Sequence, residues 1–263
     1  MIPRAYIIAW RSRVTWKSDA QIEQDLILSR ALVELFSEKF LTMKLAFRGG
    51  TALHKLHLAP ASRYSEDLDF VQITAGPIGS VLDAIRKALD PFLGKPTWKQ
   101  KQASLVLVYR MASEIPPIAN LRLKIEVNTR EHFTVIGFEK RPFEVNSRWF
   151  SGRCELTTYD LNELLGTKLR ALYQRRKGRD LFDLWFALTR GKAKPHRVVE
   201  VFQKYMVASG LTITREKFKQ NLFLKMNDHD FLHDTDGLLQ TGVVYDPQVA
   251  YRFVNDSVLS LLE

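Results

Sequence analysis

Two aspartates separated by one apolar residue are the side chains of this sequence with the most evident chemistry. Asp67 and Asp69 lie in the stretch 67–71, where their alternation with Leu68 and Phe70 is typical of a β-strand. Residues two apart on a strand share a face, so both carboxylates should lie side by side. Such a pair repels unless a hard divalent cation lies between its members, and Mg²⁺ with a nucleoside triphosphate meets that requirement. The spacing therefore predicts a metal and nucleotide site.

A pair of glycines precedes this strand. Gly49 and Gly50 follow a short predicted strand, residues 44–47, and lead into a short predicted helix, residues 51–57. Backbone N–H groups at the start of a helix, with no side chains in the way, form a cradle for phosphate. The hydroxyl of Thr51 adds a further polar group to this cradle.

Nearby cations and a third carboxylate extend the pattern. Lys55 and Arg63 are close enough in sequence to neutralise phosphate charge. Glu126 lies on the polar face of the predicted strand 120–128, whose other face is apolar, so by type it can complete a metal-binding triad. Taken singly, a Gly-Gly pair is usually a turn and an Asp-x-Asp pair a solvated strand end. The order of strand, Gly-Gly, helix, Asp-x-Asp strand and later carboxylate favours a site.

This order resembles the nucleotidyltransferase superfamily and, more narrowly, the AbiEii/AbiGii toxin family that includes the MenT toxins. The resemblance lies in Gly49-Gly50-Thr51…Lys55 and in Arg63-x-Ser65-x-Asp67-x-Asp69. It continues in a lysine within the predicted helix 160–174 and in an Arg-Asp-x-x-Asp element. These later residues are Lys168, Arg179, Asp180 and Asp183.

The resemblance implies a role for each matching residue. Asp67, Asp69 and Glu126 would hold Mg²⁺ or Mn²⁺, and Asp180 would orient the nucleotide or the acceptor. The phosphates of the nucleoside triphosphate would be held by Gly49, Gly50, Thr51 and Ser65, with help from Lys168, Arg63 and Lys55. Asp183 and Arg179 are additional candidates.

The implied activity is that of a toxin in a toxin–antitoxin or phage-defence system, inhibited by a separately encoded antitoxin. The toxin would transfer a nucleoside monophosphate from a nucleoside triphosphate to RNA, with the 3′ end of tRNA as acceptor. Two other hypotheses remain open: the same transfer to a hydroxyl of a protein or small molecule, and a basic RNA-binding module without catalysis.

Composition agrees with a polyanionic partner. The 263 residues include 39 Lys and Arg against 29 Asp and Glu, a formal net charge of +10. Five residues of a basic turn, 175–179, lie beside Lys168 in the sequence and suit RNA docking. The chain has 46% hydrophobic and 26% charged residues, which is typical of a globular protein and excludes disorder.

Cellular context follows from what the sequence lacks. One cysteine, Cys154, excludes an internal disulfide framework and favours a reducing compartment. No apolar run is long enough to cross a bilayer, and the first residues do not form a signal peptide. We expect a cytoplasmic protein with no membrane partner.

These motifs predict an α+β protein. A nucleotidyltransferase-like α/β domain with a mixed sheet, residues 1–158, should precede a helical domain, residues 159–263, that contributes Lys168 and Asp180 to the site. The first domain should contain a helix from Ser18 to Phe40, a helix ending at Pro91, strands at 103–110 and 120–128, and two strands within 143–157. The second should contain helices at 160–174, 180–190, 195–208, 214–224 and 246–262. The histidine and aspartate residues of 228–236 are interpreted as a polar loop or helix end, not a metal site.

Overall fold

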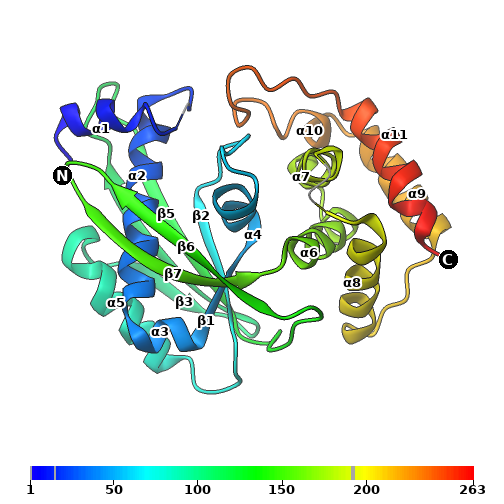
Figure 1. Cartoon of the computed structure of the whole chain (residues 1–263), viewed down its shortest axis with the longest axis horizontal. Coiled ribbons are helices and arrows are strands. Elements are labelled where there is room, and N and C mark those ends of the chain that lie inside the picture. Colours follow the sequence, from blue (N-terminus) through cyan, green and yellow to red (C-terminus); the bar gives the residue numbers. More distant parts are fainter. Residues whose placement is uncertain (1, 15, 191–192) are drawn as a thin grey trace. The chain divides into compact units, whose positions relative to one another are not determined.

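A computed structural model describes residues 2–14, 16–190 and 193–263 of the chain (Figure 1). It contains two compact units. The first comprises the chain up to Phe133 together with Phe138–Tyr159, and the second comprises Thr134–Gly137 and Asp160–Glu263. A mixed sheet in the first unit and helices in the second confirm the predicted α+β class.

The first unit is built on a seven-stranded sheet with the strand order β3-β4-β5-β2-β1-β7-β6. Its strands are β1 (Leu45–Arg48), β2 (Asp67–Gln72), β3 (Thr97–Gln100), β4 (Ser104–Ala112), β5 (Asn120–Asn128), β6 (Phe138–Asn146) and β7 (Ser151–Tyr159). β2 pairs antiparallel with β1 and parallel with β5, while β1 pairs parallel with β7. The apolar face of β5 is buried and its polar face is more exposed, which confirms the predicted alternation.

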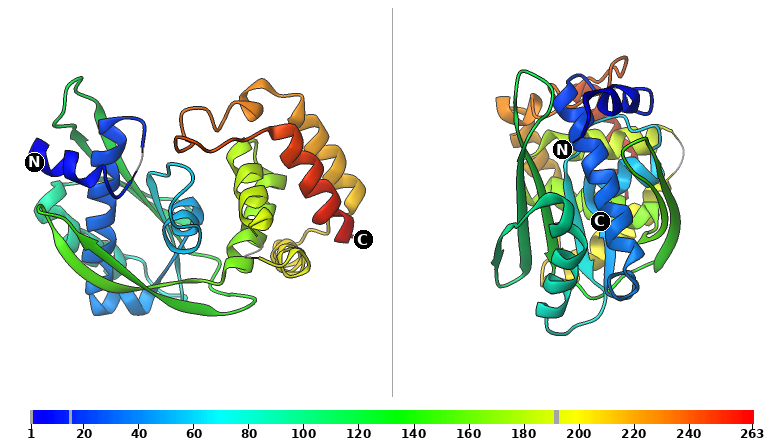
Figure 2. Two further views of the ribbon diagram at one scale, coloured as in Figure 1. Left: turned by 45° about the horizontal axis from the view of Figure 1, so that its top comes forward. Right: turned by 90° about the vertical axis from the view of Figure 1, so that its left-hand side faces the viewer.

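The helices of the first unit are α1 (Arg4–Trp10), α2 (Asp19–Ser37), α3 (Lys39–Lys44), α4 (Gly49–Ala52), η1 (Leu53–His57) and α5 (Gly79–Leu93). α2 lies lengthwise over the sheet and contacts β5, β6 and β7 (Figure 2). Its start is fixed by a capping box, in which Ser18 accepts from the Gln21 amide and the Gln21 side chain accepts from the Ser18 amide. The predicted helix start at Ser18 is confirmed.

Several predicted element bounds are wrong. The helix expected to reach Phe40 ends at Ser37, because extended backbone at Glu38 separates α2 from α3. The helix expected to stop at Pro91 continues to Leu93, since a proline in the last turn removes only its own backbone donor. β3 was not predicted: it is an exposed edge strand with no buried face, so its sequence has no alternation.

The hairpin of β6 and β7 is longer than the two strands expected within 143–157. β6 starts at Phe138, and its residues are mostly exposed or half-buried. Its sequence therefore carries little of the periodicity that marks a half-buried strand.

The second unit is helical. Its helices are α6 (Leu161–Gln174), α7 (Gly178–Thr189), α8 (Pro195–Ala208), α9 (Arg215–Met226), α10 (His229–Leu232), α11 (Pro247–Ser257) and η2 (Leu259–Leu261). α9 and α11 lie side by side (Figure 2). The last predicted helix, 246–262, is divided in the structure into α11 and the short 3₁₀ turn η2.

A buried carboxylate explains why four residues of the earlier sequence belong to the second unit. Glu163 of α6 is fully buried and accepts hydrogen bonds from the backbone amides of Val135 and Ile136, both at 2.8 Å. The hydroxyls of Thr134 and Tyr205 also donate to it. Four donors compensate the desolvation of this charge and hold Thr134–Gly137 against α6.

Among the helices that the structure describes, none is both long and apolar enough to span a membrane.

Candidate active site

The Gly-Gly turn lies where β1 ends and α4 begins. Gly49 has a φ of +79°, a conformation that favours glycine. A Cβ at this position would lie 2.3 Å from Asp69 Oδ2, so the backbone of the turn and the carboxylate of Asp69 are in direct contact. Antiparallel pairing of Arg48 with Asp69 produces this approach. Phosphate held by the turn would therefore lie next to the Asp69 carboxylate.

Gly50 is equally crowded. A Cβ there would lie 2.7 Å from the Arg63 guanidinium and 3.1 Å from Ser65 Oγ. Thr51 is buried, and its hydroxyl donates to the carbonyl of Asp67 and lies 2.9 Å from Ser65 Oγ. The structure thus brings together the turn, the Thr51 and Ser65 hydroxyls and the Arg63 cation.

Strand register places the predicted carboxylates on one face of the sheet. Asp69 of β2 is paired with Glu126 of β5, and Asp67 is paired with Lys124. Paired residues on neighbouring strands share a face, as do residues two apart on one strand. Asp67, Asp69 and Glu126 therefore share a face of the sheet, on two adjacent strands.

The charges of this face affect one another. Burial and the Asp67 charge raise the pKa of Asp69, and Glu126 acts in the same direction, while the cations Arg48 and Lys124 oppose the shift. Because burial and the neighbouring carboxylates together outweigh the opposing cations at Asp69, additional positive charge at this point would stabilise the ionised form.

Lys124 lies among the carboxylates. Its Nζ is 2.7 Å from Glu126 Oε2 and 3.9 Å from Asp67 Oδ2. Burial acts to lower the pKa of Lys124, but the hydrogen bond to Glu126 and the charge of Asp67 outweigh it and raise the pKa. Burial acts to raise the pKa of Glu126, and the same hydrogen bond and charge from Lys124 lower it overall. Lys124 and Glu126 thus stabilise each other's charge.

Two carboxylates of this face, together with the phosphates of a bound substrate, can hold a divalent cation. Within residues 2–14, 16–190 and 193–263, no group of three or more His, Cys, Asp or Glu side chains is arranged to hold a metal ion. Glu126 is turned toward Lys124, which leaves Asp69, beside the glycine turn, and Asp67, two residues earlier on the same face of β2. Mg²⁺ is commonly held by one or two carboxylates together with substrate phosphates, and this arrangement meets that requirement.

Lys55 contacts a carboxylate and a hydroxyl of α2, whereas the sequence predicts a contact with substrate phosphate. Its Nζ is 2.8 Å from Asp25 Oδ1 and 3.0 Å from Ser29 Oγ, both on α2. The ion pair is largely buried. The structure thus uses Lys55 to hold η1 against α2.

In the second unit, Lys168, Asp180 and Asp183 form one buried cluster. Lys168 Nζ lies 3.1 Å from Asp180 Oδ1 and 2.9 Å from Asp183 Oδ2, and both aspartates are fully buried. Arg175 donates to both oxygens of Asp180, at 2.7 and 2.8 Å. Burial acts to raise the pKa of Asp180, but Lys168 and Arg175 together lower it. A contribution of Lys168 and Asp180 to nucleotide binding stays a prediction.

The basic turn 175–179 is paired with the acidic stretch 228–236. Arg176 lies 2.9 Å from Asp228, and Lys177 and Arg179 both contact Asp234, at 3.5 and 3.2 Å. Together with Arg175 on Asp180, four cations of this turn have carboxylate partners. The turn therefore presents less positive charge than its sequence indicates.

Comparison with known proteins agrees with the geometry of the first unit. The family model of the nucleotidyl transferase AbiEii toxin, type IV toxin–antitoxin system, matches residues 30–246. The chain belongs to this family. It is a nucleotidyltransferase toxin of a type IV toxin–antitoxin system, and family membership implies a nucleoside triphosphate substrate and an antitoxin partner.

Solved structures show the same fold at low sequence identity. MenT4, a nucleotidyltransferase toxin from Mycobacterium tuberculosis H37Rv, is similar with a TM-score of 0.60 and 16% identity, over 100% of this chain and 91% of MenT4. A protein from H. pylori assigned as a nucleotidyltransferase is similar with a TM-score of 0.56 and 17% identity, over 93% and 95% of the two chains. No curated protein matches this AbiEii chain by sequence.

The sequence prediction missed two cations of the candidate site. Lys124 lies two residues from Glu126 on the polar face of β5, and this spacing was available as a signal. Arg48 directly precedes the glycines, opposes the rise in the pKa of Asp69 and lies 2.8 Å from Glu131. Neither residue is predicted from the sequence because metal ligands are carboxylates, whereas Arg48 and Lys124 are cations that balance the carboxylate charge.

Proposed function

We propose that this AbiEii toxin transfers a nucleoside monophosphate from a nucleoside triphosphate to RNA, at the 3′ end of tRNA, and that it requires Mg²⁺ or Mn²⁺. The observation that carries the proposal is the contact between the Gly49 turn and the Asp69 carboxylate, with Asp67 and Glu126 on the same face of the sheet. A phosphate cradle in contact with one carboxylate of a pair is what transfer from a metal-bound triphosphate needs.

Each residue of the first unit has a part in this proposal. Asp67 and Asp69 would hold the metal together with the triphosphate, Glu126 would be the third carboxylate of the same face and stay paired with Lys124, and the backbone amides of Gly49 and Gly50 would bind the β- and γ-phosphates. Arg63, whose guanidinium lies beside Gly50, would supply positive charge to the same phosphates. The Thr51 hydroxyl, which lies 2.9 Å from Ser65, would keep the turn and the loop before β2 together.

The reaction balances without another reactant. The oxygen of the acceptor hydroxyl forms a bond to the α-phosphorus, the bond from that phosphorus to the bridging oxygen breaks, and pyrophosphate leaves with the electron pair. The hydroxyl proton goes to water. Asp67 and Asp69 would hold the divalent cation, which would lower the pKa of the acceptor hydroxyl and neutralise charge on the pyrophosphate.

RNA is favoured as the acceptor by the net charge of +10, since phosphates bind Lys and Arg with release of counterions. Because the cations of the basic turn 175–179 are paired with carboxylates, we expect RNA to bind other basic surfaces of the chain. A cytoplasmic site of action follows from the RNA acceptor and the single cysteine.

Incubation of the protein with total RNA, Mg²⁺ and each α-³²P-labelled nucleoside triphosphate tests the proposal. A labelled band of tRNA size is expected, and Asp67→Ala should reduce it at least about a hundredfold, as loss of a charge-stabilising group does. Glu66→Gln is the matched control: it removes a neighbouring carboxylate that is exposed and pairs with Arg122, so labelling should persist. Labelling of a protein or small molecule instead would identify another acceptor, and RNA binding unaffected by Asp67→Ala with no labelling at all would indicate a binding module.

A further inference from the structure

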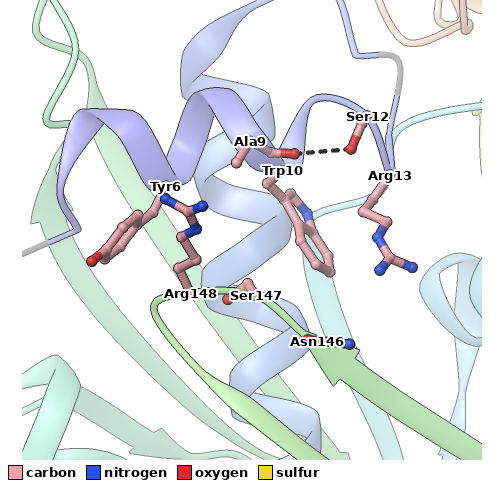
Figure 3. A pocket seen from close by; sticks show the side chains of 8 residues that line it. All are labelled: Tyr6, Ala9, Trp10, Ser12, Arg13, Asn146, Ser147 and Arg148. Atoms are coloured by element: carbon pink, nitrogen blue, oxygen red, sulfur yellow. Dashed lines mark hydrogen bonds between the residues drawn. The ribbon is translucent and has the colours of Figure 1, made fainter.

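A cavity of about 290 Å³ lies in the first unit, away from the glycine turn (Figure 3). It is lined by α1 and the residues that follow it, including Trp10 and Arg13, and by the turn of the β6–β7 hairpin, including Ser147 and Arg148. More than 130 residues separate the two lining segments, so the cavity is a product of the fold. Its volume is near the lower end of the range of small-ligand sites, roughly 300 Å³ upward, and suits a unit of about one nucleotide.

The described lining of the cavity carries positive charge and no negative charge. Two of its described lining residues are arginines and none is acidic. Arg13 and Arg148 are both exposed, and within the described parts of the chain neither forms an ion pair. Figure 3 shows their guanidinium groups on either side of the Trp10 ring. The basic turn 175–179, in contrast, has a carboxylate for four of its cations.

Hydrogen bonds connect the wall of this cavity to η1, the helix that follows the glycine turn. Trp10 Nε1 donates to Asp25 Oδ2 at 3.0 Å, and Lys55 Nζ lies 2.8 Å from the other oxygen of Asp25. Lys55 belongs to η1, which directly follows α4 and its glycines. Burial raises the pKa of Tyr64, and the charges of both Asp25 and Asp67 raise it further, so one phenol lies near both groups. The wall of the cavity is thus linked through Asp25 to the candidate active site.

We infer that this cavity, the Arg13–Arg148 pocket, binds a phosphodiester of the acceptor RNA. This inference rests on the proposed function and assigns part of its RNA surface. A guanidinium group matches phosphate oxygens with two parallel N–H donors, and two such groups without carboxylate partners can each take a phosphate contact. The half-buried ring of Tyr6 also lines the pocket and offers a stacking surface to a base, which favours nucleic acid over an acidic peptide.

Fluorescence anisotropy of a labelled single-stranded oligoribonucleotide, in the absence of nucleoside triphosphate, measures this binding directly. The double variant Arg13→Ala/Arg148→Ala should weaken it about five- to thirty-fold, because each exposed charge contact contributes modestly. The slope of log affinity against log salt concentration should fall by about 1.4, as two phosphate contacts are lost from a single strand. Lys95→Ala/Lys99→Ala, which removes two exposed cations of the same unit, is the matched control and should bind as the unaltered chain does.

The same preparations are then tested for transfer of label from α-³²P nucleoside triphosphates, so that failure of the pocket and failure of the function can be told apart. If the chain labels RNA and the double variant binds RNA with unchanged affinity and salt slope, the pocket is refuted while the proposed function stands. If binding depends on both arginines but no RNA is labelled, the pocket is supported and the transfer fails. Equal weakening by the lysine control, or binding of a poly-glutamate peptide that depends on both arginines in place of RNA, overturns the inference.

Discussion

Replacement of Lys168 by methionine should destabilise the second unit by about 3 kcal/mol. The Lys168 ammonium lies within 3.1 Å of Asp180 and 2.9 Å of Asp183, and neither carboxylate is exposed to solvent. Removal of one partner from a buried ion pair costs about 3–5 kcal/mol, since the remaining charge stays buried without compensation. The lower end applies here, because Arg175 still holds Asp180 with two hydrogen bonds.

Urea unfolding followed by circular dichroism measures this loss. With a slope of about 1.5 kcal/mol per molar urea, the midpoint of the helical unit should fall by roughly 2 M. The double variant Lys168→Met/Asp183→Asn is the matched control. It removes the uncompensated charge as well, so it should recover at least about 1 kcal/mol of the loss.

The pH dependence gives a second measure of the same cluster. The folded chain has an Asp180 pKa below the ordinary value of 3.8, so ionised Asp180 stabilises the fold above that pH and the stabilisation is lost as pH falls toward the folded pKa. Lys168→Met removes one of the charges that lower this pKa, and acid unfolding should therefore begin at a higher pH. If the variant unfolds at the same urea concentration and pH as the unaltered chain but loses transfer, Lys168 is not held by the aspartates and a direct contact with the nucleotide accounts for it.

Three further measurements test other parts of the structure. Gly49→Ala should destabilise the first unit by about 1–3 kcal/mol in thermal unfolding and abolish labelling, because φ is +79° and the new Cβ would meet Asp69 Oδ2; unchanged stability would contradict the turn geometry. Glu163→Ala should lower the free energy of unfolding by about 3 kcal/mol in urea, since it leaves buried backbone amides without an acceptor, and Glu200→Ala, at an exposed carboxylate, should change it little. Burial raises the pKa of Cys154 to about 12, so at pH 8 iodoacetamide should alkylate the folded chain about a thousandfold more slowly than the urea-unfolded chain; equal rates would show that the thiol is not buried.

Local periodicity was enough to predict the main elements. The capping box at Ser18, the alternation of β5 and the shared face of Asp67 and Asp69 all depend on residues within a few positions of one another. Capping, strand alternation and helical spacing are short-range properties, so the sequence states them directly. β3 was missed for the same reason, since an exposed edge strand has no apolar face to repeat.

Pairing across the fold was decided by tertiary structure. The register of β2 on β5 sets Glu126 beside Asp69, and it also places Lys124 where a metal-binding triad had been expected. A strand can be shifted by two residues along its neighbour and still present the same side chains to each face. Sequence periodicity alone therefore does not select this register.

The sequence by itself determined which residues are candidates for the chemistry and which faces of their elements they occupy. Only the folded chain decided the partner of each charge. The ion pairs are Lys55 with Asp25, Lys168 with Asp180 and Asp183, and Arg176 with Asp228. A buried charge must be compensated by whichever opposite charge packing brings near it, and that neighbour is often dozens of residues distant in the chain. Spacing along the sequence fixes short-range geometry, whereas compensation of buried charge depends on three-dimensional packing.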